Sequence, residues 1–334
     1  MVVNQDYLRL PWFSTFALFV PVSTKHNFLN KFEVSAIRKL LLRLGEQPTE
    51  TASQVQATHA ATRNGSVDLL RFFGAIGIIQ FHCGAPGGWF GLSALPMFVA
   101  LLVFFGAGKP ISRSFRRLMV PWIFWCCVYA FLKICQSTLS GSPLSEEFAP
   151  WMIFTGTSIH LWFLPFSFLF LVACRAIPEG LPHSLLYAGA IVLSAVTLWA
   201  CNAYSLPIPL AQWFGVVPAA CTGLLMKRTD QQILPPLVLA IATFGALWMG
   251  MGSMSGQLMI AGLAIALAFS IQIRQSKASD LLSGLAFGMY LVHPAMIAAA
   301  LYVVPVDSPL LFPLVALASL VATLVLKKII PASV

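Results

Sequence analysis

The sequence predicts an all-α fold, a polytopic membrane bundle of about ten transmembrane helices. Hydrophobic residues make up 58% of the chain and charged residues only 9%, whereas a soluble globular domain carries about 25% charged residues. Apolar runs of the length that crosses hydrocarbon recur along most of the chain. Lysine and arginine gather in alternate connections between these runs, a pattern typical of a membrane protein with a fixed orientation.

The apolar runs give the predicted helices in chain order. Some runs contain residues that interrupt a helix, such as Pro218 in the sixth run and Gly284 and Gly288 in the ninth. These breaks are tolerated where neighbouring helices satisfy the freed backbone groups. The ten runs lie near 67–83, 88–107, 118–137, 158–175, 184–201, 208–226, 233–250, 257–272, 282–303 and 309–326.

The charged residues between the runs predict the orientation. Four cations lie between the second and third runs, and others follow the fourth, sixth, eighth and tenth runs. The alternate connections contain Glu146, Glu147 and Asp307 and almost no lysine or arginine. By the positive-inside rule, both termini are expected in the cytoplasm. The net charge of +9 reflects this asymmetry, and nucleic acid is not an expected partner because no basic cluster lies in a domain that would hold a duplex.

Residues 1–65 differ from the rest and are predicted to form a cytoplasmic extension before a transmembrane domain at 66–334. The stretch "VSAIRKLLLRL" at 34–44 has leucine and isoleucine on one face and cations toward the other. This pattern predicts an amphipathic helix on the cytoplasmic lipid surface, and an ordinary surface helix is the alternative. Residues 45–65 are rich in threonine, glutamine, alanine and serine, which is typical of a linker.

The cysteines and the common catalytic motifs indicate no site. The seven cysteines lie mostly within the apolar runs and form no C-x-x-C pair, so we expect packing residues rather than a disulfide framework. The chain has no Walker loop, no H-E-x-x-H and no G-x-S-x-G motif. Because little of the chain lies outside lipid, any chemistry is expected within the bundle.

The first run, within "SVDLLRFFGAIGIIQFHCGAP" at 66–86, carries charged residues where lipid disfavours them. Residues 71 and 82 are eleven apart, a step that returns to within about 20° of the same helix face and rises about 16.5 Å. Arg71 and His82 therefore form a polar stripe, with the histidine deeper toward the outside. Asp68 precedes Arg71 by one turn and is placed to pair with it. We expect this stripe to face a cavity or partner helices.

A structural interpretation of these three residues stays open. Arg71 would then reach the cytoplasmic headgroups, His82 would bond an external headgroup, and Asp68 would favour the helix start after a serine cap. Two further histidines favour a functional interpretation. His160 lies at the outer start of the fourth run, and His293 lies midway or further out in the ninth. No acidic ligand cluster accompanies them, so no metal site is predicted.

In these stretches the sequence resembles the integral-membrane acyltransferase family 3. The family hallmark is an arginine and a histidine with ten residues between them after an Asp-x-Leu-Arg-like start, and "DLLRFFGAIGIIQFH" from Asp68 to His82 is similar to it. The family's glycine-led second span and its basic loop ending in Arg-Leu-x-x-Pro resemble "GLSALPMF" and "RSFRRLMVP". "HLWFL" and "YLVHP" resemble later blocks in the expected order, over residues 66–300 in all. The usual "FFVLSGF"-like segment is matched only loosely, by "ALPMFVALLVFF".

The resemblance implies transfer of an acyl group from cytoplasmic acyl-coenzyme A to a hydroxyl of a carbohydrate. That carbohydrate is often part of a cell-surface polysaccharide or its lipid-linked precursor. The resemblance further implies O-acetylation in exopolysaccharide biosynthesis at a bacterial inner membrane, with succinyl as the second acyl group. No permanently bound cofactor is expected, because acyl-coenzyme A is a co-substrate. Carbohydrate and membrane lipid are the expected partners, and the oligomeric state is left open.

The charged residues suit the donor that the resemblance implies. Arg71 would contact the donor phosphates from the first run. The cations Arg113, Arg116 and Arg117 of the basic loop would contribute to the same contact. His82, deeper in the bundle, would deprotonate the sugar hydroxyl or stabilise charge in the transition state. A role of His82 as acyl carrier is also left open.

Residues around the other two histidines are expected to support the site. His293 would orient the acceptor or pair with His82, and a packing role is the alternative. His160 with Trp162 would shape the outer mouth, and Tyr290 belongs to the same block as His293. The alternative functions are a glycan or lipid transporter or flippase, and a non-catalytic partner of a glycan-synthesis complex. We find no inverted repeat and few intramembrane carboxylates, which argues against the transporter.

Overall fold

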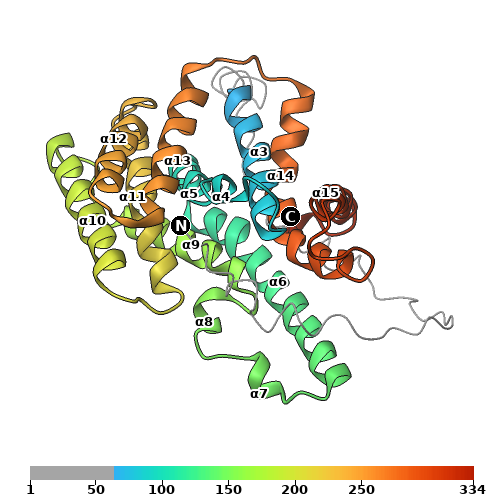
Figure 1. Ribbon diagram of the computed structural model, residues 1–334. Coiled ribbons are helices and arrows are strands. Elements are labelled where there is room, and N and C mark those ends of the chain that lie inside the picture. The colour runs from blue at the N-terminus through green and yellow to red at the C-terminus, as the bar shows by residue number, and fades with distance from the viewer. Residues whose placement is uncertain (1–63) are drawn as a thin grey trace. The chain divides into compact units, whose positions relative to one another are not determined.

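The computed structural model describes residues 64–334, and this part of the chain is helical without a β-strand (Figure 1). The predicted all-α class is confirmed for these residues, and each predicted run overlaps a helix. The helices are α3 (Gly65–His82), α4 (Gly88–Gly91), α5 (Ala94–Gly106), α6 (Ile111–Ser140), α7 (Leu144–Glu147), α8 (Met152–Thr155), α9 (Phe163–Arg175), α10 (His183–Ala203), α11 (Leu210–Arg228), α12 (Leu234–Trp248), α13 (Gly252–Ser270), α14 (Lys277–Ala300) and α15 (Leu311–Ile329), with the 3₁₀ turns η2 (Ile159–Trp162) and η3 (Pro331–Ser333).

Five helical segments of the described chain are long and apolar enough to cross a membrane, by their length and composition. The protein is therefore a multi-pass membrane protein. The number of ten crossings and the cytoplasmic side of both termini stay predictions, and the predicted helix at 34–44 lies outside the described residues. The five segments are Gly88–Gly106, Ile111–Ser140, His183–Ala203, Lys277–Ala300 and Leu311–Ile329, and the shorter apolar helices are Ile159–Arg175, Leu234–Trp248 and Met254–Ser270.

Helix α3 starts with a polar cap that ties it to the end of α13. The Asn64 side chain accepts a hydrogen bond from the Ser66 amide at 2.9 Å, which satisfies one of the free donors of the first turn. The Asn64 amide group donates to the Ala268 carbonyl at 2.9 Å, and the Ser66 hydroxyl donates to the Ile271 carbonyl at 2.5 Å. The start of α3 is thus fixed against a second helix.

Helices α3 and α14 lie side by side and run parallel (Figure 1). Near the start of both helices, Arg71 Nη1 donates to Ser283 Oγ at 2.9 Å. Further along both helices, the rings of His82 and His293 lie 5.1 Å apart. The two contacts occur in the same order along both helices, so α3 and α14 run in the same direction.

Glycines let α3 approach the helices that follow it. A Cβ added at Gly91 would lie 1.9 Å from the Gly77 carbonyl oxygen, so α3 and α4 meet backbone to backbone. A Cβ added at Gly74 would lie 2.5 Å from Met97 Cε on α5. Such small residues are common where membrane helices pack closely. The earlier residue of α3, Gly74, meets the later residue, Met97, whereas Gly77 meets Gly91. Helix α5 therefore runs antiparallel to α3 and ends on the side where α3 begins.

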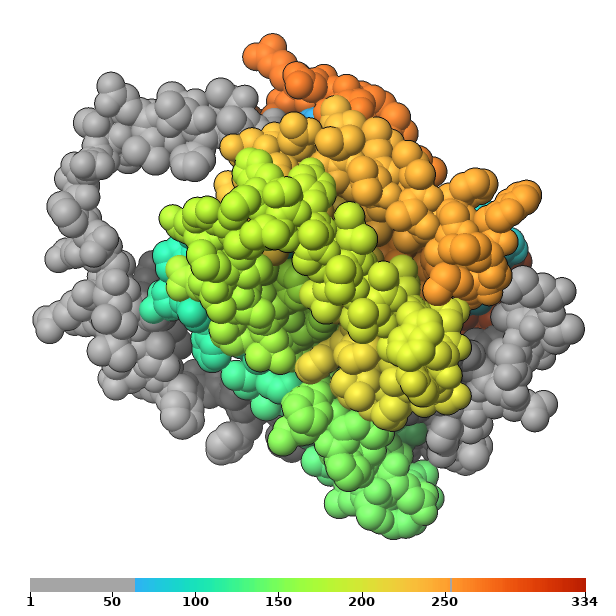
Figure 2. Space-filling view, turned by 90° about the vertical axis from the view of Figure 1, so that its left-hand side faces the viewer, coloured from blue at the N-terminus to red at the C-terminus, as the bar shows by residue number. Residues whose placement is uncertain are grey.

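The long helices differ in how much of their surface they bury. In α14, 56% of the apolar segment is buried, compared with 17% in α10 and 17% in α15. Figure 2 shows α10, coloured yellow-green, on the face toward the viewer. Its exposed side chains include Ile191, Val192 and Trp199. Helix α14 therefore belongs to the core of the bundle, whereas α10 presents an apolar surface suited to lipid.

Candidate active site

Three histidines from separate parts of the chain meet in the core. His82 is the last residue of α3, His160 lies in η2, and His293 lies in α14. The ring centroids of His82 and His293 are 5.1 Å apart, and those of His160 and His293 are 5.5 Å apart. His160 is 6% exposed and His293 is 0% exposed. We call these three residues the histidine cluster.

The segment before α9 fixes the position of His160. Gly156 has a φ of 83°, a conformation that favours glycine, where the chain leaves α8 toward η2. The Oγ of Ser158 lies 2.9 Å from Nδ1 of His160. The hydroxyl of Tyr290 donates a hydrogen bond to the His160 carbonyl. Both the ring and the backbone of His160 are therefore held in place.

The hydrogen bond of His293 determines which ring nitrogen carries its proton. Nδ1 of His293 lies 2.7 Å from the carbonyl oxygen of Tyr290. A carbonyl only accepts, so neutral His293 keeps its proton on Nδ1 and its lone pair on Nε2. This Nε2 is buried without a hydrogen-bond partner among the described residues, and so is Nε2 of His160. A nitrogen of this kind has the chemistry of a general base.

Tyr129 of α6 joins the histidine cluster, although it was not among the residues predicted for the site. Its ring centroid lies 5.1 Å from that of His160, and its hydroxyl donates to the Leu291 carbonyl of α14 at 2.7 Å. The signal in the sequence was a tyrosine within an apolar run, because a buried hydroxyl requires a hydrogen-bond partner. Tyr129 thus connects α6 to the helix that carries His293.

Arg71 lies near the opposite end of α3 from His82, and two side chains hold its guanidinium. Its Nη1 donates to Ser283 Oγ at 2.9 Å and lies 4.0 Å from Asp68 Oδ1. The expected pairing of Asp68 with Arg71 is therefore present. The Asp68 side chain is 4% exposed and that of Arg71 is 21% exposed. Ser283, which no motif indicated, fixes the arginine against α14.

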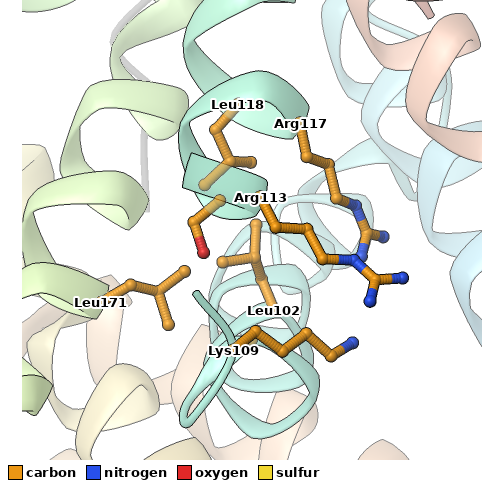
Figure 3. A pocket seen from close by; sticks show the side chains of 8 residues that line it. Leu102, Lys109, Arg113, Arg117, Leu118 and Leu171 are labelled. Atoms are coloured by element: carbon orange, nitrogen blue, oxygen red, sulfur yellow. The ribbon is translucent and has the colours of Figure 1, made fainter. Parts of the chain in front are cut away.

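Basic side chains gather where α5 leads into α6. Lys109, Arg113 and Arg117, called here the loop cations, line a small pocket and extend in the same direction (Figure 3). The prediction that both arginines lie in a loop is wrong, because α6 begins at Ile111 and includes them, whereas Lys109 lies in the connection before it. Burial lowers the pKa of Lys109, and the charges of Arg117, Arg113 and Lys227 lower it further. Arg116, predicted for the same group, is exposed on α6 and does not line this pocket. Cations that repel one another in this way favour a bound anion.

The loop cations lie at the same end of the bundle as Arg71. Helix α5 runs antiparallel to α3 and ends three residues before Lys109. Near that end, Phe104 packs against Phe269 of α13 with ring centroids 5.5 Å apart, and α13 also holds the cap of α3 at Asn64. The site therefore has cations at one end and histidines about 16.5 Å further along α3, about half the thickness of the hydrocarbon.

A family match covers most of the chain that carries this arrangement. The family model described as an acyltransferase domain matches residues 64–328. The chain belongs to membrane acyltransferase family 3. The resemblance read from the sequence is thereby confirmed. Searches of curated proteins and of solved structures gave no significant match.

In this acyltransferase the predicted site residues form two groups, and their roles in the reaction stay predictions. Trp162, expected at the outer mouth, is 5% exposed, and its ring centroid lies 6.2 Å from that of Phe166. It therefore belongs to the core between η2 and α9. Within 64–334 no group of three or more histidine, cysteine or acidic side chains is arranged to hold a metal ion. The first group is His82, His160, His293 and Tyr290, and the second is Asp68 and Arg71 with Arg113 and Arg117 of α6.

Proposed function

We propose that this acyltransferase moves an acyl group from acyl-coenzyme A to a hydroxyl of a carbohydrate, with acetyl as the first candidate and succinyl as the second. The acceptor is a cell-surface polysaccharide or its lipid-linked precursor, and the enzyme acts in a bacterial inner membrane. One observation carries the proposal. The parallel helices α3 and α14 join Arg71 to Ser283 at one end and His82 to His293 at the other.

The shape of the donor suits this geometry. Acyl-coenzyme A has anionic phosphates at one end and a thioester at the tip of a long arm. Arg71 and the loop cations would bind the phosphates, because guanidinium groups form paired hydrogen bonds with phosphate oxygens. The arm would then follow α3 and α14 toward the histidine cluster. The donor is a co-substrate in this scheme, and no resident cofactor is required.

The histidine cluster would supply the proton transfer. Nε2 of His293, or the ring of His82, takes the proton of the acceptor hydroxyl. The hydroxyl oxygen attacks the thioester carbonyl carbon, a C–O bond forms, and the C–S bond breaks. The thiolate then takes the proton from the imidazolium, so the products are an ester and free coenzyme A. In the alternative, His82 first carries the acyl group and the hydroxyl attacks that intermediate.

Mass spectrometry of surface glycans from cells with and without the gene tests the proposal. We expect the glycan to lose one ester substituent while its backbone stays intact. Loss of the whole polymer would instead favour a glycan or lipid transporter. Incubation of the reconstituted protein with radiolabelled acetyl-coenzyme A and with succinyl-coenzyme A, each with the purified glycan, identifies the acyl group. If the protein transfers neither acetyl nor succinyl to the glycan, the proposed choice of acyl group is wrong.

A further inference from the structure

A pocket of about 210 Å³ opens beside His82. Its walls come from the end of α3 with the two residues that follow it, the end of α14, the start of α15 and the connection between α14 and α15. Four of its eight lining residues are aliphatic, and one is a carboxylate. Besides His82, the side chains that matter here are Ile297, Leu301, Val306, Asp307 and Leu311.

The pocket lies beyond the histidine cluster, away from the cations. Ile297 follows His293 by four residues in α14, and Leu301, the C-cap of that helix, follows it by eight, which is about one and two helical turns. Ser283, the partner of Arg71, precedes His293 in the same helix. A donor whose phosphates are bound by Arg71 would therefore bring its thioester to one side of the cluster. The pocket leaves the other side of His82 open to a second reactant.

The lining has the chemistry of a site for a sugar ring. The aliphatic side chains of Ile297, Leu301 and Leu311 offer a surface for the C–H faces of a ring. Asp307 is exposed at the pocket and, when ionised, only accepts hydrogen bonds. Hydroxyl groups next to the reacting one can donate to it. His82 then meets the hydroxyl that points inward.

The connection between α14 and α15 contributes Val306 and Asp307 to the pocket, and its residues 303–310 are called here the rim. Several aliphatic side chains of the rim are exposed. Val303 is 75% exposed, Val306 is 58% exposed and Leu310 is 65% exposed. In a membrane protein, exposed aliphatic residues that flank a carboxylate suit the boundary between hydrocarbon and headgroups. A free polysaccharide has no apolar part that would bind there, whereas a lipid-linked saccharide has one.

We infer that this pocket is the acceptor site and that the acceptor is a saccharide linked to a lipid. The sugar ring enters between α14 and α15, Asp307 accepts hydrogen bonds from its hydroxyl groups, and the hydrocarbon part lies against the rim formed by residues 303–310. This inference rests on the proposed acyl transfer and narrows it. It selects the lipid-linked precursor over the finished polymer as the substrate.

The test compares two acceptor forms with the full chain in lipid nanodiscs. The probes are polyprenyl-diphosphate-linked glucose, galactose and N-acetylglucosamine, with the matching methyl glycosides. Acyl-coenzyme A hydrolysis without acceptor is measured in parallel, because it requires the donor and the histidines but no sugar. We expect at least one lipid-linked sugar to be acylated with a kcat/KM about tenfold or more above that of its methyl glycoside. Equal use of both forms would overturn the inference.

Two variants of the pocket locate the effect. Asp307→Asn should raise KM for the lipid-linked acceptor about tenfold, since hydrogen bonds to a charged group are lost, and should lower transfer more than hydrolysis. Glu146→Gln removes an exposed carboxylate away from the pocket and serves as the matched control. Leu301→Trp fills the pocket and should also reduce transfer more than hydrolysis.

The outcomes separate this inference from the proposed function. If Leu301→Trp lowers hydrolysis as much as transfer and changes the preferred acyl length, the pocket holds the acyl group and the inference is wrong. If Asp307→Asn behaves like Glu146→Gln, the carboxylate does not bind the acceptor and the inference is also wrong. If the wild-type protein neither hydrolyses acyl-coenzyme A nor transfers its acyl group to any probe, the proposed function itself fails.

Discussion

The two ends of the α3–α14 pair satisfy their polar groups differently. At the Arg71 end, the guanidinium has Ser283 and Asp68 as partners, and the arginines at the start of α6 are exposed. At the other end, His160 and His293 are buried, and the Nε2 atom of each lacks a hydrogen-bond partner among the described residues. An end that binds a charged group needs little beyond fixed cations. In the proposed function the histidine end performs the chemistry, and such an end would retain hydrogen-bonding capacity for the reacting groups.

The largest effect is expected from the histidine cluster. His82→Ala should lower turnover about a hundredfold or more, the usual scale of general acid–base catalysis. His293→Asn should lower turnover comparably, because the asparagine amide still donates to the Tyr290 carbonyl while the lone pair of Nε2 is lost. Donor affinity should stay close to wild type in both variants. Radiolabelled acyl-coenzyme A transfer and equilibrium donor binding, measured on the same preparations, check this prediction.

His183→Ala is the matched control for these histidine variants, since His183 is exposed at the start of α10. Its turnover should equal that of the wild type. A His82→Ala protein that transfers at near the wild-type rate would remove His82 from the base role and leave His293. If His293→Asn also keeps full turnover, neither histidine is the base, and the difference between the two ends of the pair has another origin.

An intermediate effect is expected at Arg71. Arg71→Ala should weaken donor binding about tenfold or more, because hydrogen bonds to a charged group are lost, whereas turnover at saturating donor should change less. Arg71→Lys should restore only part of the affinity, since a point charge replaces a forked donor. Binding titrations against acyl-coenzyme A and against the truncated donor acyl-pantetheine check this. Equal losses for both ligands would mean that Arg71 does not contact the phosphates.

The smallest effect is expected from Lys109. Its pKa is lowered by burial and by the charges of Arg117, Arg113 and Lys227. The folded state therefore disfavours the charged form, and stability should increase as pH rises through the lowered pKa toward the value of the unfolded chain. Lys109→Met should raise the thermal midpoint slightly and remove that increase. Donor affinity should fall about two- to fivefold, as expected for a partly exposed charge.

Lys328→Met provides the control for Lys109, because Lys328 is exposed at the end of α15. It should leave the midpoint and the donor affinity unchanged. Thermal unfolding scans at several pH values and donor titrations on both variants give the comparison. A lower midpoint for Lys109→Met would show that the lysine stabilises the protein without donor, contrary to the expected repulsion from the neighbouring cations.

The sequence predicted the part of the site that lies on a single helix. The helical period placed Arg71 and His82 on one face of α3, and both residues contact α14 in the structure. The meeting of His160 with His293 was not predictable, because it depends on how η2 packs against a helix more than a hundred residues later in the chain. Ser283 was not predicted as the partner of Arg71 for the same reason. A lone serine in an apolar run has no partner until the helices are packed.

The connection after α6 shows a second limit of sequence patterns. No sequence pattern indicated a partner for Glu147, the last residue of α7. Its carboxylate lies 3.8 Å from Nζ of Lys133, which also donates to the Glu147 carbonyl and is 2% exposed. A buried lysine requires an acceptor, and the chain folds back after α6 to supply it. The period of α6 alone did not reveal where that acceptor would come from.

The contacts at both ends of α3 and α14 fix the distance between the cations and the histidine cluster. Neither helix can slide along the other without breaking the Arg71–Ser283 bond or separating His82 from His293. Under the proposed function, the distance between the donor's phosphates and the reacting histidines would therefore be set by helical rise and not by the ligand. A thioester on a shorter arm would reach the histidines only after releasing the cations. The protein would therefore select its donor by the length of the arm, whatever acyl group the arm carries.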